Sequence, residues 1–305
     1  NCAFGSHTLQ LNTTAGNNSA FGHRALDANT TGDNNSAFGN SALGANTTAD
    51  KCTSVGSGSL NSNTTGGSNT AYGYQAAYSN TTGNTNTALG YESLYTNVAG
   101  DRNTAVGLQS FYTMNPSGNA DTYNTGLGYH SGYATTTGTN NTAIGGLALT
   151  ANTTGGQLTA VGKSALAANT TGNNNTAIGE SAMLTSTTAQ DCVAVGREAL
   201  KRLTTGDDNT AIGTEACKEI TTGARNTAVG YLSQFTQTTG SSNTSMGESS
   251  LKLLTTGDNN TCIGREAGKN ITTASNNTAV GAEAFKLNTT GANNVALGAN
   301  ALDAN

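Results

Sequence analysis

The sequence has no tryptophan and a single proline among its 305 residues, and charged side chains make up only 10% of it. Hydrophobic residues account for 34% and aromatic residues for 5%. A globular enzyme of this length needs a core with more large apolar side chains than that. A disordered chain is also poor in such residues, but it is usually rich in charge and proline. The composition therefore excludes both classes and indicates a regular repeat.

Basic runs and long apolar stretches are also missing. The formal net charge is −5, and the 13 Lys and Arg residues are scattered along the chain. Nucleic-acid binding needs a basic stripe, so we expect no nucleic-acid partner. No stretch approaches the roughly 20 apolar residues that cross a bilayer, so we expect no membrane insertion. The sequence starts at Asn1 rather than at a methionine, which we interpret as a processed chain or a segment.

What is abundant is glycine, asparagine and threonine, with 40, 40 and 54 residues. They recur in a tetrapeptide like Thr-Ala-Ile-Gly, of which the chain contains 18 copies. Sixteen of the 17 intervals between the closing glycines are 17 residues long, and the one from Gly107 to Gly128 is 21. Such a fixed period is the signature of a solenoid. We therefore expect residues 1–305 to form a single repeat domain of 18 coils.

The positions of the repeat are chemically sorted. The residue before each closing glycine is always apolar, the residue two before is small, and the residue four before is Asn in 15 of 18 copies. A Leu usually follows the glycine by four residues, and a Thr-Thr pair by eight and nine. The structural repeat is represented by Ile144, Gly145, Ala177, Ile178, Gly179, Ala211, Ile212 and Gly213.

Thr-Ala-Ile-Gly is typical of a short strand, in which the large residue and the Ala point to opposite faces. We expect the large residue to fill the coil's own core and the Ala and Gly to face a second backbone. The Asn before the strand is expected to form a side-chain ladder. Asn-Thr-Thr-Gly is expected to turn, with Gly at positive φ and Asn bonding to local backbone.

These patterns predict an all-β fold, a parallel β-solenoid or β-roll. A helix over residues 198–203 is the alternative, but Gly and Asn-Thr-Thr interrupt every period and leave segments too short to be stable helices. Each coil has few apolar positions to offset the ordering of 17 residues, at about 1.5 kcal/mol each. We therefore expect a homo-oligomer, with three chains as the best interpretation.

The strand Asn175-Thr-Ala-Ile-Gly179 resembles the head repeats of trimeric autotransporter adhesins of the YadA-like group. With Asn169-Thr-Thr-Gly172, it is also similar to repeats of phage tail-fibre proteins. The resemblance implies an extracellular homotrimeric fibre, on a virion tail or a cell surface, with a role in adhesion. The period of 17 is longer than that of the adhesin heads, and no stalk, anchor or chaperone is visible.

The long interval is the best candidate for a contact with a host receptor or glycan, because insertions in solenoids form loops that often bind. The insertion loop spans about 111–123, and its candidate contact residues are Phe111, Tyr112, Asn115, Pro116, Asn119, Asp121 and Tyr123. Tyrosines gather in this half of the chain and could stack on sugars. Tyr72 instead takes the position of a core apolar residue.

Enzymatic and metal chemistry find little support. His7 and His23 lie on adjacent coils, but no third ligand recurs. Glu198, Glu215, Glu266 and Glu283 form a spaced row that we interpret as solvated surface, not a pair across one sugar. The five cysteines are interpreted as free thiols, with bonding between chains as the alternative. We expect no catalytic residue, no metal and no cofactor.

Three other functions stay open. The chain could be the subunit of a self-assembling extracellular filament. It could bind ice through Thr ladders, which needs two outward rows, whereas an extended Thr-Thr pair sends its side chains to opposite sides. It could also cleave sugars. The Asn-x-Thr sequons, for example at Asn12, Asn29, Asn46, Asn152 and Asn169, could carry glycans in a secreted chain.

Overall fold

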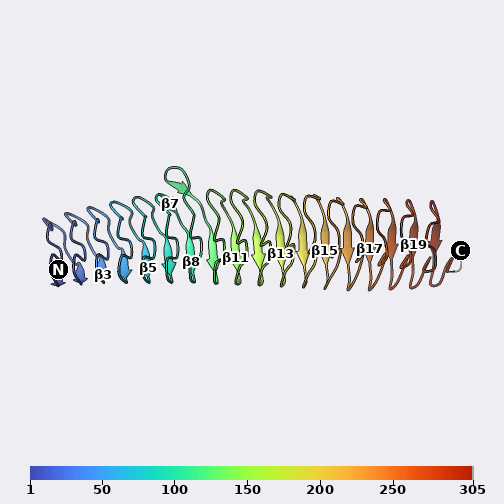
Figure 1. Cartoon of the computed structure of the whole chain (residues 1–305), viewed down its shortest axis with the longest axis horizontal. Coiled ribbons are helices and arrows are strands. Elements are labelled where there is room, and N and C mark those ends of the chain that lie inside the picture. The colour runs from blue at the N-terminus through green and yellow to red at the C-terminus, as the bar shows by residue number, and fades with distance from the viewer. Residues whose placement is uncertain (304–305) are drawn as a thin grey trace. The chain divides into compact units, whose positions relative to one another are not determined.

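The computed structural model describes residues 1–303, which contain β-strands and turns but no helix. They therefore hold no helix that could cross a membrane. The chain divides into two compact units, the first spanning Asn1–Gly156 and the second beginning at Gln157. In each unit the strands are parallel and successive coils stack on one another, so the prediction of a parallel β-solenoid is confirmed (Figure 1).

The first unit contains nine three-residue strands that pair in chain order. Their side chains are in register, so that Ala20 lies opposite Ala37 and Phe21 opposite Phe38. A short additional pair, β7 with β9, lies outside this stack. The bounds are β1 (Cys2–Phe4), β2 (Ser19–Phe21), β3 (Ser36–Phe38), β4 (Thr53–Val55), β5 (Thr70–Tyr72), β6 (Thr87–Leu89), β7 (Gly100–Asp101), β8 (Thr104–Val106), β9 (Ala120–Asp121), β10 (Thr125–Leu127) and β11 (Thr142–Ile144).

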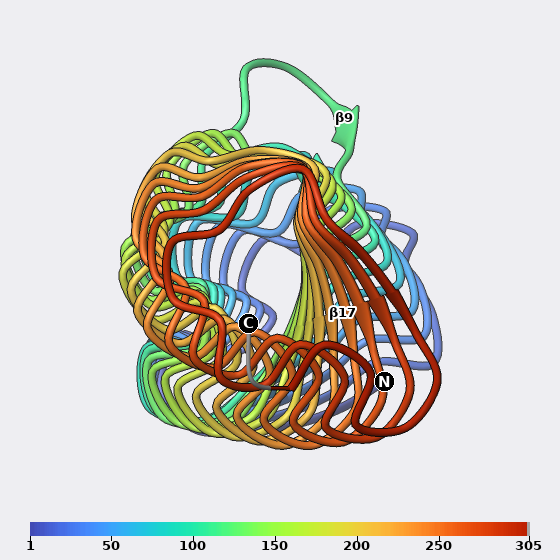
Figure 2. The ribbon, with the colours of Figure 1, turned by 90° about the vertical axis from the view of Figure 1, so that its right-hand side faces the viewer.

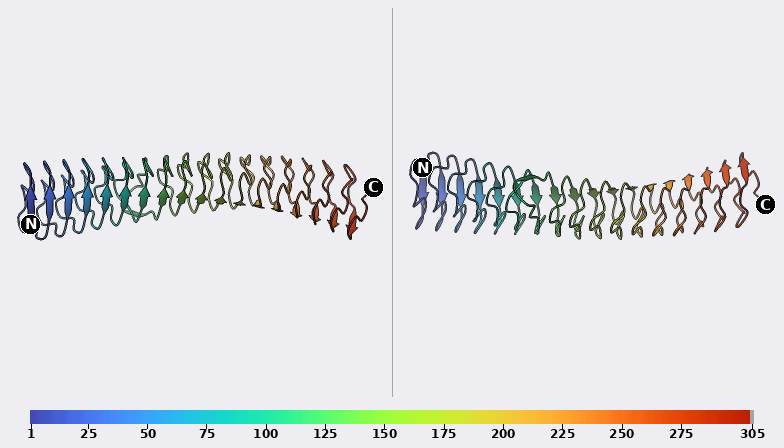
Figure 3. Two further views of the ribbon diagram at one scale, coloured as in Figure 1. Left: turned by 90° about the horizontal axis from the view of Figure 1, so that it is seen from below. Right: turned by 90° about the horizontal axis from the view of Figure 1, so that it is seen from above.

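The second unit repeats this arrangement with nine further strands. Neighbouring strands again pair in parallel, with Ala177 opposite Ala194 and Ile178 opposite Val195. Figure 3 shows these strands side by side in chain order, coloured from yellow-green to red. The bounds are β12 (Thr159–Val161), β13 (Thr176–Ile178), β14 (Val193–Val195), β15 (Thr210–Ile212), β16 (Thr227–Val229), β17 (Thr244–Met246), β18 (Thr261–Ile263), β19 (Thr278–Val280) and β20 (Val295–Leu297).

The strand orientation is the reverse of the prediction. The small middle residue points into the coil, where Ala177 and Ala211 are fully buried. The large residue points outward, and Ile178 and Ile212 are 40% and 41% exposed. The coil interior already holds the leucines that follow each strand, such as Leu200, which is fully buried. Only a small side chain fits between the strand and that leucine row, as with Ala177 or Cys262, so the larger side chain lies outside.

The segment after each strand forms tight turns instead of a helix. In the segment over which a helix was the alternative, Glu198 and Leu200 have φ of 58° and 51°. The left-handed region costs roughly 1–2 kcal/mol per non-glycine residue. Inter-coil hydrogen bonds continue through this segment, as in the Leu200 N–H donating to the Ala216 carbonyl at 3.0 Å. The burial of Leu200 helps to offset the strain.

Side-chain amides hold the coils in register, as predicted. The backbone N–H of Asn35 donates to Oδ1 of Asn18 at 2.8 Å, and the contact repeats at many coils. A second ladder runs through the turns, where Nδ2 of Asn46 donates to Oδ1 of Asn29 at 2.8 Å. Both ladders are buried, so each amide satisfies backbone groups that water cannot reach.

Positive φ occurs at the strand-ending glycines and not at the glycines of the Asn-Thr-Thr-Gly turns, which corrects the prediction for that motif. Gly179 has a φ of 135°, whereas the turn residue Gly172 is outside that region. A Cβ at Gly179 would lie 2.5 Å from the carbonyl oxygen of Gly196 on the next coil. Only glycine therefore fits at the end of this strand. Gly145 and Gly213 share this conformation, with φ of 126° and 135°.

Candidate interaction surfaces

An outward row of large apolar residues follows the strands of each unit, and we call it the apolar row. Each three-residue strand contributes its last residue, and the pairing places successive members on adjacent strands. The exposed fraction is 75% for Phe4, 58% for Tyr72 and 78% for Leu297. The members are Phe4, Phe21, Phe38, Val55, Tyr72, Leu89, Val106, Leu127 and Ile144 in the first unit, and Val161, Ile178, Val195, Ile212, Val229, Met246, Ile263, Val280 and Leu297 in the second.

The apolar row is flanked by uncharged residues on the strand side, whereas in the second unit exposed charged residues lie two positions after members of the row, namely Lys163, Glu180, Arg197, Glu248 and Arg265. The first residue of each strand lies on the same outward side and is mostly Thr, as at Thr176 and Thr210, which are half-buried. At the start of the first unit, the rings of Phe21 and Phe38 stack with centroids 4.9 Å apart. A contiguous exposed apolar surface of this kind marks an interaction site in a soluble protein. The row is the strongest candidate functional surface, and it consists of residues that we expected inside the coil.

Four tyrosines of the first unit form a second ladder, the tyrosine ladder. Tyr78, Tyr95, Tyr112 and Tyr133 stack with ring centroids 5.4, 5.1 and 5.3 Å apart and interplanar angles of 11° or less. Desolvation raises the pKa of Tyr95 above its ordinary value. Because neighbouring rings cover one another's faces, the interior of this ladder offers ring edges and hydroxyls, not the open faces on which a sugar stacks.

Other aromatic residues pair nearby in the same unit. Tyr74 and Tyr91 stack at 5.3 Å and remain about half exposed. Tyr129 stacks on His130 at 3.9 Å, and Nε2 of His130 lies 2.8 Å from Oε1 of Gln109. Burial lowers the pKa of His130. Tyr72 belongs to the outward apolar row, so its assignment to the core was wrong.

The insertion loop divides into a buried and an exposed part. Phe111 is fully buried, and Pro116 is buried as well, so neither is available for an outside contact. Tyr112 is half-buried in the tyrosine ladder. The exposed part contains Asn115, Asn119, Asp121 and Tyr123. Figure 2 shows the segment leading to β9 standing out from the other coils of its unit.

The exposed part of the loop is held against the two preceding coils. Oγ1 of Thr82 donates to Oδ1 of Asn119 at 2.7 Å. Asp121 pairs with the Arg102 guanidinium and accepts a hydrogen bond from the Tyr123 hydroxyl at 3.2 Å. The same guanidinium lies 5.5 Å from the Tyr123 ring centroid. These contacts give the loop one defined shape that presents a carboxylate, a guanidinium and a phenol together.

The partly exposed glutamates of the second unit form ion-pair ladders along its surface. Nζ of Lys218 lies 2.7 Å from Glu198 and 3.4 Å from Glu215, on successive coils. Hydrogen bonds from Lys218 and Lys201 lower the pKa of Glu198 to about 2. Glu266 and Glu283 share Lys286 in the same way. Because lysine ammonium groups already occupy the oxygens of these carboxylates, the carboxylates are poorly suited to bind calcium.

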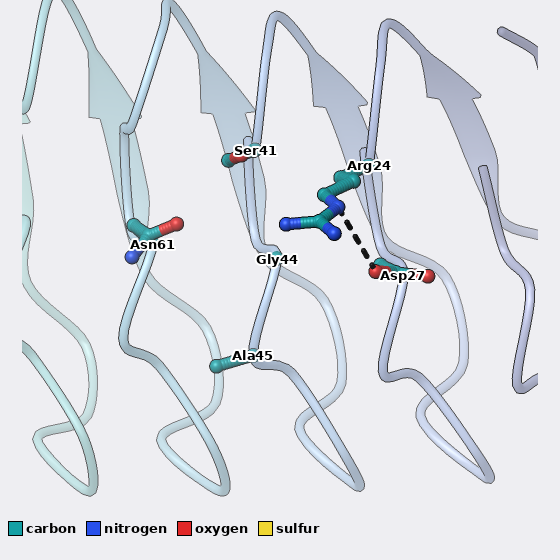
Figure 4. Close-up of a pocket in the computed structure, with 6 residues that line it drawn as sticks. All are labelled: Arg24, Asp27, Ser41, Gly44, Ala45 and Asn61. Carbon is teal, nitrogen blue, oxygen red and sulfur yellow. Dashed lines mark ion pairs between the residues drawn. The ribbon is translucent and has the colours of Figure 1, made fainter. Parts of the chain in front are cut away.

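A shallow hollow lies on the turn side of the first unit, where Gly44 leaves space between side chains of neighbouring coils. Its volume is about 200 Å³, and Figure 4 shows the Arg24 side chain extending over it. Nε of Arg24 lies 3.9 Å from Asp27, and Ser41 and Asn61 complete the polar lining. The hollow could accept a small polar group but brings no nucleophile or acid–base pair together.

The remaining candidates show no catalytic or metal-binding arrangement. His7 and His23 meet edge to face with ring centroids 5.9 Å apart. Within residues 1–303, no three His, Cys, Asp or Glu side chains group as metal ligands. All five cysteines are free, with Cys2 exposed and the others buried. Desolvation raises the pKa of Cys52 to about 11 and that of Cys262 to about 12.

Comparison with known proteins adds no assignment to these surfaces. No family model matches the sequence, and no curated protein matches it at a significant level. Function must therefore be argued from the surfaces themselves.

Proposed function

We propose that this chain is a non-enzymatic, extracellular fibre shaft that assembles as a homotrimer through its apolar rows. In this proposal 18 coils, one of them 21 residues long, serve surface adhesion or receptor attachment, as in a phage tail fibre or a cell-surface adhesin. The observation that carries the proposal is the outward apolar row, with Ile178 and Ile212 about 40% exposed. The resemblance to trimeric adhesin heads and tail-fibre repeats supports it.

Another copy of the same chain is the partner that fits the row best. It supplies apolar side chains with the same spacing, so each residue can meet its own counterpart around a symmetry axis. The threonines that begin the strands are uncharged, so on this side identical rows approach without like-charge repulsion. Each chain has one narrow apolar row. When the rows of three chains meet at one axis, they shield one another from water. Burial then removes the apolar side chains from water.

The native mass of the purified chain, measured by light scattering, tests this assembly. A mass near three times the 30.5 kDa of one chain is expected. The variant Ile178→Lys/Ile212→Lys places two charges in the row and should shift the mass toward one chain. The matched control, Thr171→Lys/Thr205→Lys, places the same charges at exposed turn residues of the same coils and should keep three chains. A monomeric wild-type chain would refute the assembly.

The loop contact is the second part of the proposal. The exposed group formed by Arg102, Asp121 and Tyr123 offers polar and aromatic contacts to a host-surface glycan or receptor. Tyr123→Ala should weaken binding to a glycan array or to cells while the native mass stays unchanged. Equal binding by wild type and variant would exclude the loop as the contact.

Filament and ice-binding roles each have one favourable observation. The parallel, in-register pairing repeats from coil to coil, which is compatible with rods that grow by end-to-end stacking. Electron microscopy would distinguish such growing rods from particles of one length.

Strand threonines such as Thr210 share the outward side with Ile212, so Thr and apolar rows run together. Measurable thermal hysteresis would favour ice binding. The bulky Phe21 and Tyr72 argue against it in the first unit, because they make the outward surface uneven.

A further inference from the structure

The chain carries two recurring kinds of Asn-x-Ser/Thr sequon, and the structure separates them by accessibility. One kind lies in the Asn-Thr-Thr turns, where every acceptor Asn is buried apart from the half-buried Asn12. The other kind is Asn-Asn-Ser/Thr, whose acceptor lies two residues before a strand and is always exposed, whereas the sequons of buried Asn243 and half-buried Asn270 belong to neither kind. We call these exposed acceptors the sequon row: Asn17, Asn34 and Asn140 in the first unit, and Asn174, Asn259 and Asn276 in the second.

We propose that the sequon row is a set of N-glycan acceptor sites and that the buried turn asparagines remain unmodified in the folded chain. This inference rests on the cell-surface form of the proposed function, in which the chain is secreted, because N-glycans are added to secreted chains. In each coil that carries a member, it lies one residue before the Asn ladder. A glycan there extends into solvent without entering the coil.

Backbone geometry explains why the row is accessible. Asn17, Asn34 and Asn174 have φ of 58°, 60° and 58°, a left-handed conformation that asparagine tolerates better than most residues. The chain turns sharply there, so the side chain points outward while the next Asn points inward to the ladder. The hydroxyl that completes the sequon, for example on Ser36 or Thr176, is half-buried on the outer side of the strand.

The chemistry of the amide distinguishes the two kinds. In the transfer, Nδ2 forms a bond to the anomeric carbon of a lipid-pyrophosphate-linked oligosaccharide. The bond from that carbon to the pyrophosphate oxygen breaks, Nδ2 loses one proton, and the lipid pyrophosphate leaves with the bonding pair. The modified amide keeps one N–H. That is sufficient for Asn174, whose Nδ2 makes an exposed hydrogen bond of 3.0 Å to Asp191.

The turn asparagines need both N–H groups. Nδ2 of Asn46 donates to Oδ1 of Asn29 at 2.8 Å and to the Ala49 carbonyl at 3.1 Å. Nδ2 of Asn80 likewise donates to Asn63 at 2.7 Å and to Gly83 at 2.9 Å. A glycan would remove one of these bonds and place a sugar inside the coil. A chain modified there cannot close its coils and should not reach the secreted, folded fraction.

Site mapping on the full chain, secreted from a eukaryotic host, tests the proposal. Enzymatic deglycosylation converts each occupied Asn to Asp, which mass spectrometry locates. Asn34 and the other members of the row should be occupied, and Asn29 and Asn46 should be unmodified. Ser36→Ala should remove one glycan. Thr31→Ala, which destroys the sequon of buried Asn29 on the same coil through an exposed Thr, should leave the glycan number unchanged.

The results separate this inference from the proposed assembly. An unmodified sequon row, or a glycan on Asn29 or Asn46 in the secreted folded chain, would overturn it. The native mass after deglycosylation reports the oligomer independently. A bare row on a trimeric particle therefore defeats only the glycan inference, and a glycosylated monomer defeats only the assembly.

Discussion

The Asn ladder makes a quantitative prediction at Asn260, whose side chain is fully buried in the second unit. Its Oδ1 accepts hydrogen bonds from the backbone N–H and from Nδ2 of Asn277, both at 3.1 Å. Its Nδ2 donates to Oδ1 of Asn243 at 3.0 Å and to the Ala274 carbonyl at 2.9 Å. Asn260→Ala would leave three groups without these bonds, namely two donors of Asn277 and the carbonyl of Ala274. Oδ1 of Asn243 still accepts the Asn260 backbone N–H.

An unsatisfied buried polar group costs about 1–3 kcal/mol, so the three together should cost at least about 3 kcal/mol of unfolding free energy. The assay is urea denaturation followed by circular dichroism, with Asn259→Ala as the exposed neighbour for control. Hydrogen exchange should also show faster exchange at the Asn277 amide. Equal denaturation midpoints for the two variants would refute the reasoning that the buried Asn ladder holds the coils in register.

Three further outcomes follow from the core and the ion pairs. Gln237→Leu should stabilise the chain by about 1 kcal/mol in the same denaturation assay, because it removes Oε1, a buried acceptor without a hydrogen-bond donor. Nε2 of Gln237 donates to Oδ1 of Asn226 and to the Gly240 carbonyl, and both acceptors keep a second donor, the Asn243 N–H and Asn226 Nδ2. Leu254 fills the same position on the next coil, and a lower midpoint would contradict this prediction. In the native chain at pH 8, iodoacetamide should label Cys2 alone, since the other four thiols are buried and desolvation raises the pKa of Cys192 to about 11; mass spectrometry after unfolding should find all five labelled. The lowered pKa of Glu198 and Glu266, about 2 in each, means that their stabilisation is fully present above the ordinary carboxyl pKa of 4.5 and is lost as the pH falls toward 2. Glu198→Gln should flatten that part of the stability profile, and an unchanged slope between pH 5 and 2 would argue against the ion-pair ladder.

The period, the strand positions and the Asn ladder could be predicted from the sequence because each depends on spacing alone. The facing of the strand could not. Alternation shows that Ala177 and Ile178 point to opposite sides, but it does not show which side is enclosed. Hydrophobicity suggested that the isoleucine lies inside. The width of the coil decides otherwise, because Leu200 already occupies the interior opposite the strand.

The ion pairs and the aromatic contacts were predicted only in part, because the spacing of the repeat shows which residues share a row but not how the turns between them run. A fixed period places Glu198 and Glu215 in one row, but the bond from Lys218 to both depends on the path of the turn between them. One feature of the insertion could have been recognised. Phe111 follows Gly107 by four residues, which is the buried Leu position of the repeat, so its interior location was readable from the spacing.

The insertion loop also shows where this architecture tolerates change. The extra residues leave the coil and return to it, and Thr125 still pairs in register with Thr104. The stacking of the coils on either side therefore does not depend on the length of the insertion. A strand-ending glycine such as Gly179 has no such freedom, because the next coil's carbonyl occupies the space of any side chain. Lineages of this protein should thus diversify in length at the turn near Asn119, and the same point is where an engineer could splice in a foreign peptide for display.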